Sequence, residues 1–251
     1  MRLTGRVAIV TGAGRGIGRA IALLYAREGA KVVLAARNER QLQVVSEEIA
    51  VAGGVSLAAT TDVRAKADTE RMARQAVERF GRIDILVNNA GVARHNYILD
   101  VPEEDYDLTF DVNMKGIFLC TQAVLPRMME QRAGRIINIS SGAGLRGSPR
   151  KSVYSASKFA VIGFSDSLAQ EVGQYGIAVN VICPGPVATD MRHNSYPLED
   201  PALLPEPGDV ADLALFLASD EARTIHNAVI RVAWGPHPIP VNETVTPLEE
   251  G

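Results

Sequence analysis

The sequence has little of what characterises secreted, membrane-spanning or nucleic-acid-binding proteins. It contains only two cysteines, Cys120 and Cys183, and both lie in apolar runs where a buried reduced thiol is commoner than a disulfide. Its 26 Lys and Arg against 29 Asp and Glu give a formal net charge of -3, without the basic excess of nucleic-acid binders. No apolar run approaches the ~20 residues that span a bilayer, and no signal-peptide core follows the N-terminus. We expect a cytoplasmic protein with no nucleic-acid or membrane partner.

Histidine is too sparse to indicate a metal site or a hydrolase. The four histidines are His95, His193, His226 and His237. They form no H-E-x-x-H motif, and paired C-x-x-C is missing too, so we expect no metal. None shows a local signature that would align it with a serine nucleophile, which disfavours hydrolase chemistry. We expect these single histidines to be surface or capping residues.

The pattern of apolar residues indicates an α/β fold. Of the 251 residues, 47% are hydrophobic and 22% charged, which is enough for a sizeable core and excludes general disorder. Short apolar runs predict seven strands, at residues 7–10, 31–36, 56–61, 83–87, 135–139, 177–182 and 228–232. Segments of helical period between them predict helices at 17–28, 39–52, 65–80, 103–130, 153–174 and 209–218. This alternation predicts a doubly wound, mainly parallel sheet of the Rossmann type, with helices on both faces, in a single domain over 1–235.

Two proline-rich stretches interrupt this alternation. Residues 192–207 contain four prolines in sixteen residues, and the tail at 236–251 contains Pro236, Pro238, Pro240 and Pro247. Neither stretch has a clear helical period, and proline is poorly tolerated inside helices. We expect irregular structure in both.

Glycine is plentiful, with 22 residues and an early cluster at Gly12, Gly14, Gly16 and Gly18. The cluster follows the first predicted strand and opens a helix, the position at which backbone N–H groups and the helix dipole bind phosphate. Its spacing, counted from Thr11, is T-G-x-x-x-G-x-G rather than G-x-G-x-x-G. Taken alone, the cluster also fits an ordinary tight turn between a strand and a helix.

Later motifs follow in the order and spacing of one family: Asn88-Asn-Ala-Gly91, Ser141, Tyr154-x-x-x-Lys158 and Pro184-Gly185. Over residues 2 to about 232, the chain resembles the short-chain dehydrogenase/reductases, and most closely 3-oxoacyl-acyl-carrier-protein reductases and related ketoreductases. The resemblance implies an oxidoreductase that reduces a ketone, of the 3-oxoacyl type or similar, to a secondary alcohol. It also implies a small-molecule carbonyl or alcohol substrate, free or thioester-linked, and a homotetramer or dimer.

The same resemblance implies a cofactor site. The glycine turn cradles the pyrophosphate, Asp62 and Val63 border the adenine, and Thr189 faces the nicotinamide amide. The implied site comprises Gly12, Arg15, Gly16, Ile17, Gly18, Arg37, Asp62, Val63, Asn89, Ala90, Gly91, Tyr154, Lys158, Pro184, Gly185 and Thr189.

The end of the second predicted strand favours NADP(H) over NAD(H). An acidic residue there would bind both ribose hydroxyls and repel a 2′-phosphate, but this position is Ala36. Arg37 follows it, and Arg15 lies in the glycine turn, so two guanidinium groups are available for a phosphate dianion. Solvated surface arginines would fit the sequence too.

Tyr154 and Lys158 are four residues apart in a predicted helix and therefore share a face. A tyrosine has a pKa of ~10, and we expect the lysine cation to lower it toward the working range. By resemblance, Tyr154 is the general acid, and Ser141 hydrogen-bonds the substrate oxygen. Ser140 is the competing serine, and a plain amphipathic surface helix is the alternative interpretation of the Tyr/Lys pair.

The remaining implied residues concern the proton relay and the substrate. Asn113 matches the asparagine that holds a water against the lysine, and it is also a candidate helix-kinking residue. Residues 191–207 match the substrate segment, where we expect an open mouth without the lid helices common in the family. Arg132 matches a basic carrier-binding position, whereas Tyr175 replaces a second one, and residues 226–236 depart from the family ending. An NAD-dependent alcohol or polyol dehydrogenase and a nucleotide-binding sensor or scaffold remain the alternative functions.

Overall fold

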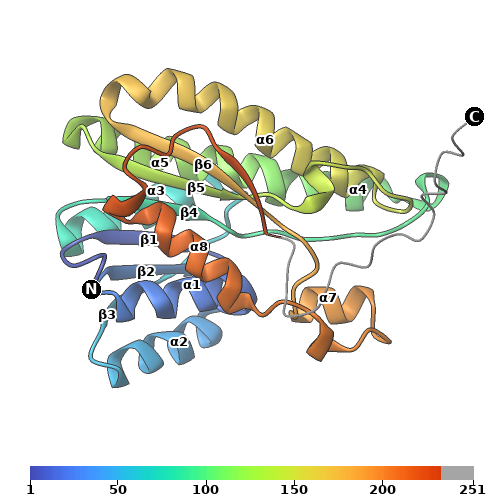
Figure 1. Ribbon diagram of the computed structural model, residues 1–251, viewed down its shortest axis with the longest axis horizontal. Coiled ribbons are helices and arrows are strands. Elements are labelled where there is room, and N and C mark those ends of the chain that lie inside the picture. The colour runs from blue at the N-terminus through green and yellow to red at the C-terminus, as the bar shows by residue number, and fades with distance from the viewer. Residues whose placement is uncertain (233–251) are drawn as a thin grey trace, which may run out of the picture.

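Seven parallel strands form one sheet in the order β3-β2-β1-β4-β5-β6-β7 (Figure 1). The strands are β1 (Val7–Thr11), β2 (Lys31–Ala36), β3 (Val55–Thr60), β4 (Ile85–Asn88), β5 (Gly134–Ile139), β6 (Ile177–Pro184) and β7 (Val229–Val232). The structure is a computed structural model that describes residues 1–232, so the predicted proline-rich tail lies outside the described residues. The predicted doubly wound single-domain fold is confirmed.

Helices cover both faces of the sheet. They are α1 (Gly16–Arg27), α2 (Glu39–Val51), α3 (Lys66–Phe80), α4 (Glu103–Phe110), α5 (Gly116–Gln131), α6 (Ser152–Val172), α7 (Asp190–Ser195) and α8 (Pro207–Ala218). Helices α1, α2 and α8 pack on one face, and α3, α5 and α6 pack on the other (Figure 1). Among the helices of residues 1–232, none has the length and apolar character that a bilayer crossing requires.

The strands from β1 to β6 serve both core layers because successive side chains of a strand point to opposite faces. In β1, Ile9 packs into the layer under α3, α5 and α6, whereas Val10 packs into the layer under α1, α2 and α8. Both side chains are fully buried. Burial on both faces explains why the strands are near-continuous apolar runs in the sequence. The two cysteines, Cys120 and Cys183, are buried and free, as predicted.

The predicted helix over 103–130 is interrupted. Between α4 and α5, residues Asp111–Lys115 form a π-helical turn. Asn113 lies in this turn, where its amide bonds to the backbone of Val92 and to Ser157 on α6. The prediction of one regular helix was wrong because these tertiary hydrogen bonds favour the wider turn locally.

Residues 191–207 are also more regular than predicted. Helix α7 begins here, and Pro201–Leu203 form a 3-10 turn. The Thr189 hydroxyl caps α7 by accepting a hydrogen bond from the Arg192 N–H, and Arg192 pairs with Glu199. The prediction of a wholly irregular segment was therefore wrong. A helix of six residues is too short to show a hydrophobic period, so side-chain capping and the ion pair are its visible stabilising contacts.

Asp84 connects the start of β1 to the neighbouring strands β4 and β5. Its side chain, 3% exposed, accepts a hydrogen bond of 2.8 Å from the Val7 N–H and contacts the guanidinium of Arg82 at 2.6 Å. Its backbone carbonyl accepts from Arg135 at the start of β5. One acidic residue thus fixes the starts of three neighbouring strands.

We predict that Asp84→Ala lowers the free energy of unfolding by about 1–3 kcal/mol because the buried Val7 N–H loses its acceptor. Asp84→Asn retains an acceptor oxygen and should cost less. Urea unfolding of both variants, followed by circular dichroism at one protein concentration, measures the difference. Identical transition midpoints for Asp84→Ala and the parent chain would contradict this account.

Candidate functional site

The candidate site lies at the carboxyl ends of the central strands. Strand β1 is flanked by β2 on one side and β4 on the other, so the chain direction of the crossovers reverses between β1 and β4. In open α/β sheets, ligands bind in the crevice outside this switch point. The glycine turn follows β1, the Asn89–Gly91 loop follows β4, Ser141 follows β5, and Gly185 follows β6.

The glycine turn has a backbone that only glycine accommodates. Gly12 and Gly16 have φ values of +67° and +54°, in the left-handed region. A Cβ on Gly18 would lie 2.3 Å from the Gly12 carbonyl oxygen and 2.4 Å from Nδ2 of Asn89. The spacing of these glycines is therefore required by the close packing of the turn against α1 and the loop after β4.

The first turn of α1 is suited to an anion. Its N-cap residue, Arg15, makes no side-chain capping hydrogen bond, and the turn contains no acidic residue. Free N–H groups and the positive end of the helix dipole bind phosphate at this position. Thr189 lies beside it, since its Cγ2 would be 3.4 Å from a Cβ on Gly16. The residues present thus fit the phosphates of a dinucleotide, with Ile17 packed partly into the core below.

Thr11 joins the two loops that form the phosphate side of the site. Its hydroxyl accepts hydrogen bonds from the backbone N–H groups of Asn89 (2.9 Å) and Ala90 (3.0 Å). Asn89 in turn donates its amide to the Thr11 carbonyl. This role of Thr11 was not predicted, although its place directly before the glycines was the available signal.

The predicted adenosine side contains an ion pair that was not predicted. The guanidinium of Arg64 donates to the Asp62 carboxylate from Nε, at 3.0 and 3.1 Å, and from Nη2, at 2.6 Å. Arg64 is the main cause of the lowered pKa of Asp62, and Arg37 contributes electrostatically. Val63 is buried and packs against Gly116 at the start of α5.

The two arginines proposed for a 2′-phosphate have different surroundings. Arg37 is exposed at the end of β2 and lies near enough to Asp62 to affect its pKa. Arg15 lies 3.6 Å from Asp190 at the start of α7, and both of these side chains are more than half exposed. Arg15 thus bridges the glycine turn and α7.

Lys158 is a buried cation without a counter-ion. Its side chain is 4% exposed, and its ammonium donates a hydrogen bond of 2.9 Å to the Ile139 carbonyl at the end of β5. Among residues 1–232, no carboxylate lies within 4 Å of it. Burial lowers the pKa of Lys158 from 10.5 to about 8. An ammonium kept in such a place is costly unless it serves the site.

Tyr154 lies one helical turn before Lys158, with the ammonium 5.9 Å from the centre of the phenol ring. Burial raises the pKa of Tyr154, and a hydrogen bond with Ser141 offsets this only in part. The expectation that Lys158 lowers the pKa of this phenol does not describe the structure, because desolvation dominates. The Tyr154 phenol therefore stays protonated at neutral pH, as a proton donor requires.

The two adjacent serines have different partners. The Ser140 hydroxyl is buried and donates to the Lys158 carbonyl at 2.9 Å, which ties β5 to α6. The Ser141 hydroxyl is half-buried beside Tyr154 and accepts from the Ala143 N–H at 3.1 Å. This difference supports Ser141, rather than Ser140, as the residue that meets a substrate.

Asn113 connects the π-helical turn to α6. Its Nδ2 donates to the Ser157 hydroxyl at 3.0 Å, and Ser157 donates to the Tyr154 carbonyl at 2.7 Å. Both Asn113 and Lys158 approach Gly91, with Oδ1 at 3.3 Å and Nζ at 3.7 Å from a Cβ built there. Asn113 therefore lies beside the lysine, and it also occupies the helix irregularity that the sequence suggested as its alternative role. Ser157 was not predicted.

His95 departs from the expectation that single histidines are surface or capping residues, whereas the exposed His226 agrees with it. The ring of His95 packs at 5.8 Å from that of Tyr154, nearly edge-on, and at 5.9 Å from that of Tyr196. His226 accepts from the Val179 N–H and contacts the Ala169 carbonyl. Packing between loops decides these positions, and a single histidine carries no such signal in sequence. His237 lies outside the described residues.

Three comparisons with known proteins agree with this geometry. The family model described as short chain dehydrogenase matches residues 6–200. The chain is 41% identical to a 3-oxoacyl-[acyl-carrier-protein] reductase of Synechocystis sp. over 88% of this chain and 92% of that protein. It is 39% identical to (2S)-[(R)-hydroxy(phenyl)methyl]succinyl-CoA dehydrogenase subunit BbsD of Thauera aromatica, over 94% and 98%.

A solved structure extends the likeness to three dimensions. The 7α-hydroxysteroid dehydrogenase complexed with NADH and 7-oxo glycochenodeoxycholic acid aligns with a TM-score of 0.87 and 32% identity. The alignment covers 92% of this chain and 94% of that one. With the family model matching more than half of the chain, these likenesses show that the protein belongs to the short-chain dehydrogenase family of oxidoreductases, acting on carbonyl or alcohol groups.

Proposed function

We propose that the protein is an NADP(H)-dependent ketoreductase that converts a 3-oxoacyl-type or similar ketone to a secondary alcohol, with Tyr154 as general acid. One observation carries the proposal: the buried ammonium of Lys158, which no carboxylate of residues 1–232 approaches within 4 Å, lies 5.9 Å from the ring centre of Tyr154, and Ser141 lies near enough to that phenol to affect its pKa. A structural helix alone would gain nothing from a desolvated cation there.

The roles of these residues follow from their chemistry. Ser141 donates a hydrogen bond to the substrate carbonyl oxygen, where negative charge develops during reduction. Tyr154 delivers its phenolic proton to that oxygen, and Lys158 stabilises the phenolate left behind. Asn113, beside Lys158, positions the path by which Tyr154 is reprotonated from solvent.

The cofactor proposal assigns the phosphates to the glycine turn and the first turn of α1, the nicotinamide end to Thr189 and Gly185, and the adenosine to Asp62 and Val63. When bound, the nicotinamide cofactor supplies the hydride for the carbonyl carbon. Asn89, Ala90 and Gly91 support the adenosine side from β4. Among residues 1–232, no group of three or more His, Cys, Asp or Glu side chains is arranged to hold a metal ion.

Preference for NADP(H) is supported by the charge at the end of β2. Ala36 supplies no carboxylate to repel a 2′-phosphate, and Arg37 is exposed next to it. Asp62 is the nearby acid, and the guanidinium of Arg64 neutralises it in an ion pair. A phosphate dianion would therefore meet a net positive surface.

The substrate class is supported by the relatives. One is named for 3-oxoacyl groups on an acyl carrier protein and another for a succinyl-CoA derivative, and both names indicate thioester-linked substrates. We extend to this chain the reduction of a ketone near such a thioester. Carrier docking at Arg132 has weaker support, since its guanidinium donates to the Gln174 carbonyl and Tyr175 replaces the second basic position.

Two further sequence-based expectations remain proposals. We propose a homotetramer or dimer, as in the family. We also propose a cytoplasmic location, which is supported by two free, buried cysteines because disulfides are rare in that compartment.

We predict that Tyr154→Phe lowers kcat by about 100-fold to 10,000-fold, because it removes the proton donor and leaves the ring in place. Steady-state NADPH oxidation against a panel of ketones, diketones and acetoacetyl thioesters measures this. Tyr175→Phe, which removes a hydroxyl outside the site, is the matched control and should keep full activity. Near-normal turnover by Tyr154→Phe would refute the mechanism, and no turnover by the parent chain on any substrate would favour a sensor.

The lowered pKa of Lys158 predicts a pH dependence. The ammonium is charged below about pH 8 and is lost as the pH rises through that value in the free enzyme. The Tyr154 phenol stays protonated there because its pKa is raised. We therefore expect kcat/KM for reduction to fall above about pH 8, which a pH profile at fixed ionic strength measures. A flat profile between pH 7 and 9 would show that the charge of Lys158 is not needed.

We predict a kcat/KM preference for NADPH over NADH that Arg37→Gln reduces by roughly tenfold to 100-fold, the value of one charge-assisted hydrogen bond. Ala36→Asp should reverse the preference by adding a carboxylate that binds ribose hydroxyls and repels phosphate. Arg74→Gln on α3 is the control for loss of a surface charge. A parent chain that prefers NADH would instead support an NAD-dependent alcohol dehydrogenase.

A further inference from the structure

Three cations gather around His95 at the open side of the candidate site. They are Arg150 and Lys151, directly before α6, and Arg192 in α7. All three lie near enough to contribute to the lowered pKa of the His95 imidazole, whose main cause is burial. We call Arg150, Lys151 and Arg192 the cationic mouth. Like charges gathered in one place repel each other, so the mouth requires either acidic partners within the protein or an anionic ligand.

The nearby acids do not neutralise the cationic mouth. Glu199 forms two hydrogen bonds with Arg192 and also feels the charge of Lys151. The other neighbouring acids are used elsewhere, Asp105 by Arg94 and Asp190 by Arg15. Within the described residues 1–232, neither Arg150 nor Lys151 has a carboxylate within 4 Å. The charges of Arg150 and Lys151 are therefore not neutralised by an ion pair within residues 1–232.

A continuous path of rings connects these charges to the reaction centre. The His95 ring contacts that of Tyr154 on one side and that of Tyr196 on the other, at 5.8 and 5.9 Å. The Lys151 ammonium lies 5.4 Å from the Tyr196 ring centre. Two rings, those of His95 and Tyr196, thus lie between the proposed proton donor Tyr154 and the Lys151 ammonium. A substrate whose carbonyl lies at Tyr154 would extend along His95 toward Lys151.

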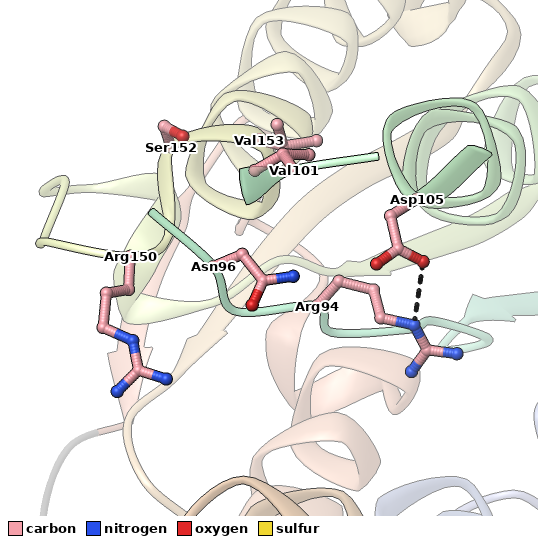
Figure 2. A pocket seen from close by; sticks show the side chains of 7 residues that line it. All are labelled: Arg94, Asn96, Val101, Asp105, Arg150, Ser152 and Val153. Carbon is pink, nitrogen blue, oxygen red and sulfur yellow. Dashed lines mark hydrogen bonds and ion pairs between the residues drawn. The ribbon is translucent and has the colours of Figure 1, made fainter. Parts of the chain in front are cut away.

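Arg150 also lines a surface pocket. The pocket is lined by Arg94, Asn96, Val101, Asp105, Arg150, Ser152 and Val153, and Asn96 lies between the two arginines (Figure 2). Arg94 is joined to Asp105 in the same view (Figure 2). Arg150 has a φ of 65°, in the left-handed region that a non-glycine residue rarely adopts. Such strained backbone is commonly retained at ligand sites.

The segments that follow β4 and α7 also expose apolar side chains. Ile98 and Leu99, in the loop after β4, are 67% and 94% exposed, and Leu198 and Leu203, after α7, are 99% and 58% exposed. Large apolar side chains exposed on the segments that border a site are available to bind an apolar group. The expected ligand therefore has an apolar body and a charged end.

We propose that the substrate is a largely apolar ketone with an anionic group remote from its carbonyl, and that Arg150 and Lys151 bind this group. The inference rests on the proposed ketoreductase function and specifies its substrate. A carboxylate of the substrate and a phosphate of a thioester carrier such as coenzyme A provide the same chemistry, so the experiment separates them.

The test compares matched neutral and anionic substrates. Diethyl 3-oxoadipate and its monoethyl ester free acid test a carboxylate, and acetoacetyl-N-acetylcysteamine and acetoacetyl-CoA test carrier phosphates. For each pair, the ratio of kcat/KM for the anionic to the neutral member is measured at low salt for the parent chain and for Arg150→Gln, Lys151→Gln and the double variant. Arg74→Gln is the matched control.

We expect the double variant to lower the anionic-to-neutral ratio by about tenfold to 100-fold for at least one pair, which is the effect of losing exposed charge-assisted hydrogen bonds. The pair that responds identifies carboxylate or phosphate. Added salt should reduce the ratio of the parent chain in the same direction, because the mouth is exposed. A ratio that the double variant leaves unchanged for both pairs would overturn the proposal.

Binding calorimetry separates this inference from the proposed function. The same four compounds are titrated into the parent chain and the double variant. An anion preference that the double variant loses would support the cationic mouth even if no compound is reduced, in which case the ketoreductase proposal alone fails. Reduction of the neutral ketones without any anion preference in binding or kinetics would overturn the inference and leave the ketoreductase proposal intact.

Discussion

The buried ammonium of Lys158 is the constraint around which the site is arranged. Taking an ion out of water costs several kcal/mol even after the protein relaxes, and no carboxylate among residues 1–232 lies close enough to offset this. The ammonium donates a hydrogen bond to the Ile139 carbonyl at the end of β5. The backbone carbonyl of Lys158 accepts a hydrogen bond from the hydroxyl of Ser140, the next residue. A Cβ on Gly144 would lie 2.5 Å from that hydroxyl, so even the following turn must stay small to keep α6 against β5. The position of Tyr154 follows, because it is one helical turn away.

The order of the strands determines which residues come together on the proposed cofactor side of the site. Residues as far apart as Gly12, Asn89 and Ser141 meet because parallel strands end at the same edge of the sheet. Below that edge, β4 and β5 are joined by a buried amide pair, Asn88 and Asn138, at 2.9 Å, and Asn138 donates onward to Ser165 of α6. A polar network of this kind rigidifies a core when its donors find partners. The strand ends and α6 are therefore fixed relative to each other before any ligand binds.

The sequence predicted the features that local rules decide. Every predicted strand agrees with the structure to within two residues, since a strand buried on both faces must be apolar throughout. The glycine turn was predictable because positive φ and close backbone contact exclude side chains. The features that were missed depend on contacts between distant segments: Asn113 makes a π-helical turn only through Val92 and Ser157, and α7 is too short for a period. His95 and Arg64 are ordinary surface types in sequence, and only packing against Tyr154 and Asp62 gives them a role.

The net charge of the chain does not describe the local charge of the candidate site, which is what a ligand meets. The chain carries a formal net charge of -3, yet its site is positive at three depths: the first turn of α1, the ammonium of Lys158, and the outer pair Arg150 and Lys151. The acids that border the site are each held by an arginine, as Glu199 is by Arg192, so they stabilise loops without cancelling the local field. A cleft lined by one sign of charge raises the local concentration of oppositely charged ligands, whatever the sum over the whole surface. The ion-paired acids and the cations without a carboxylate partner within residues 1–232 thus concentrate positive charge around the site of a chain whose net charge is negative.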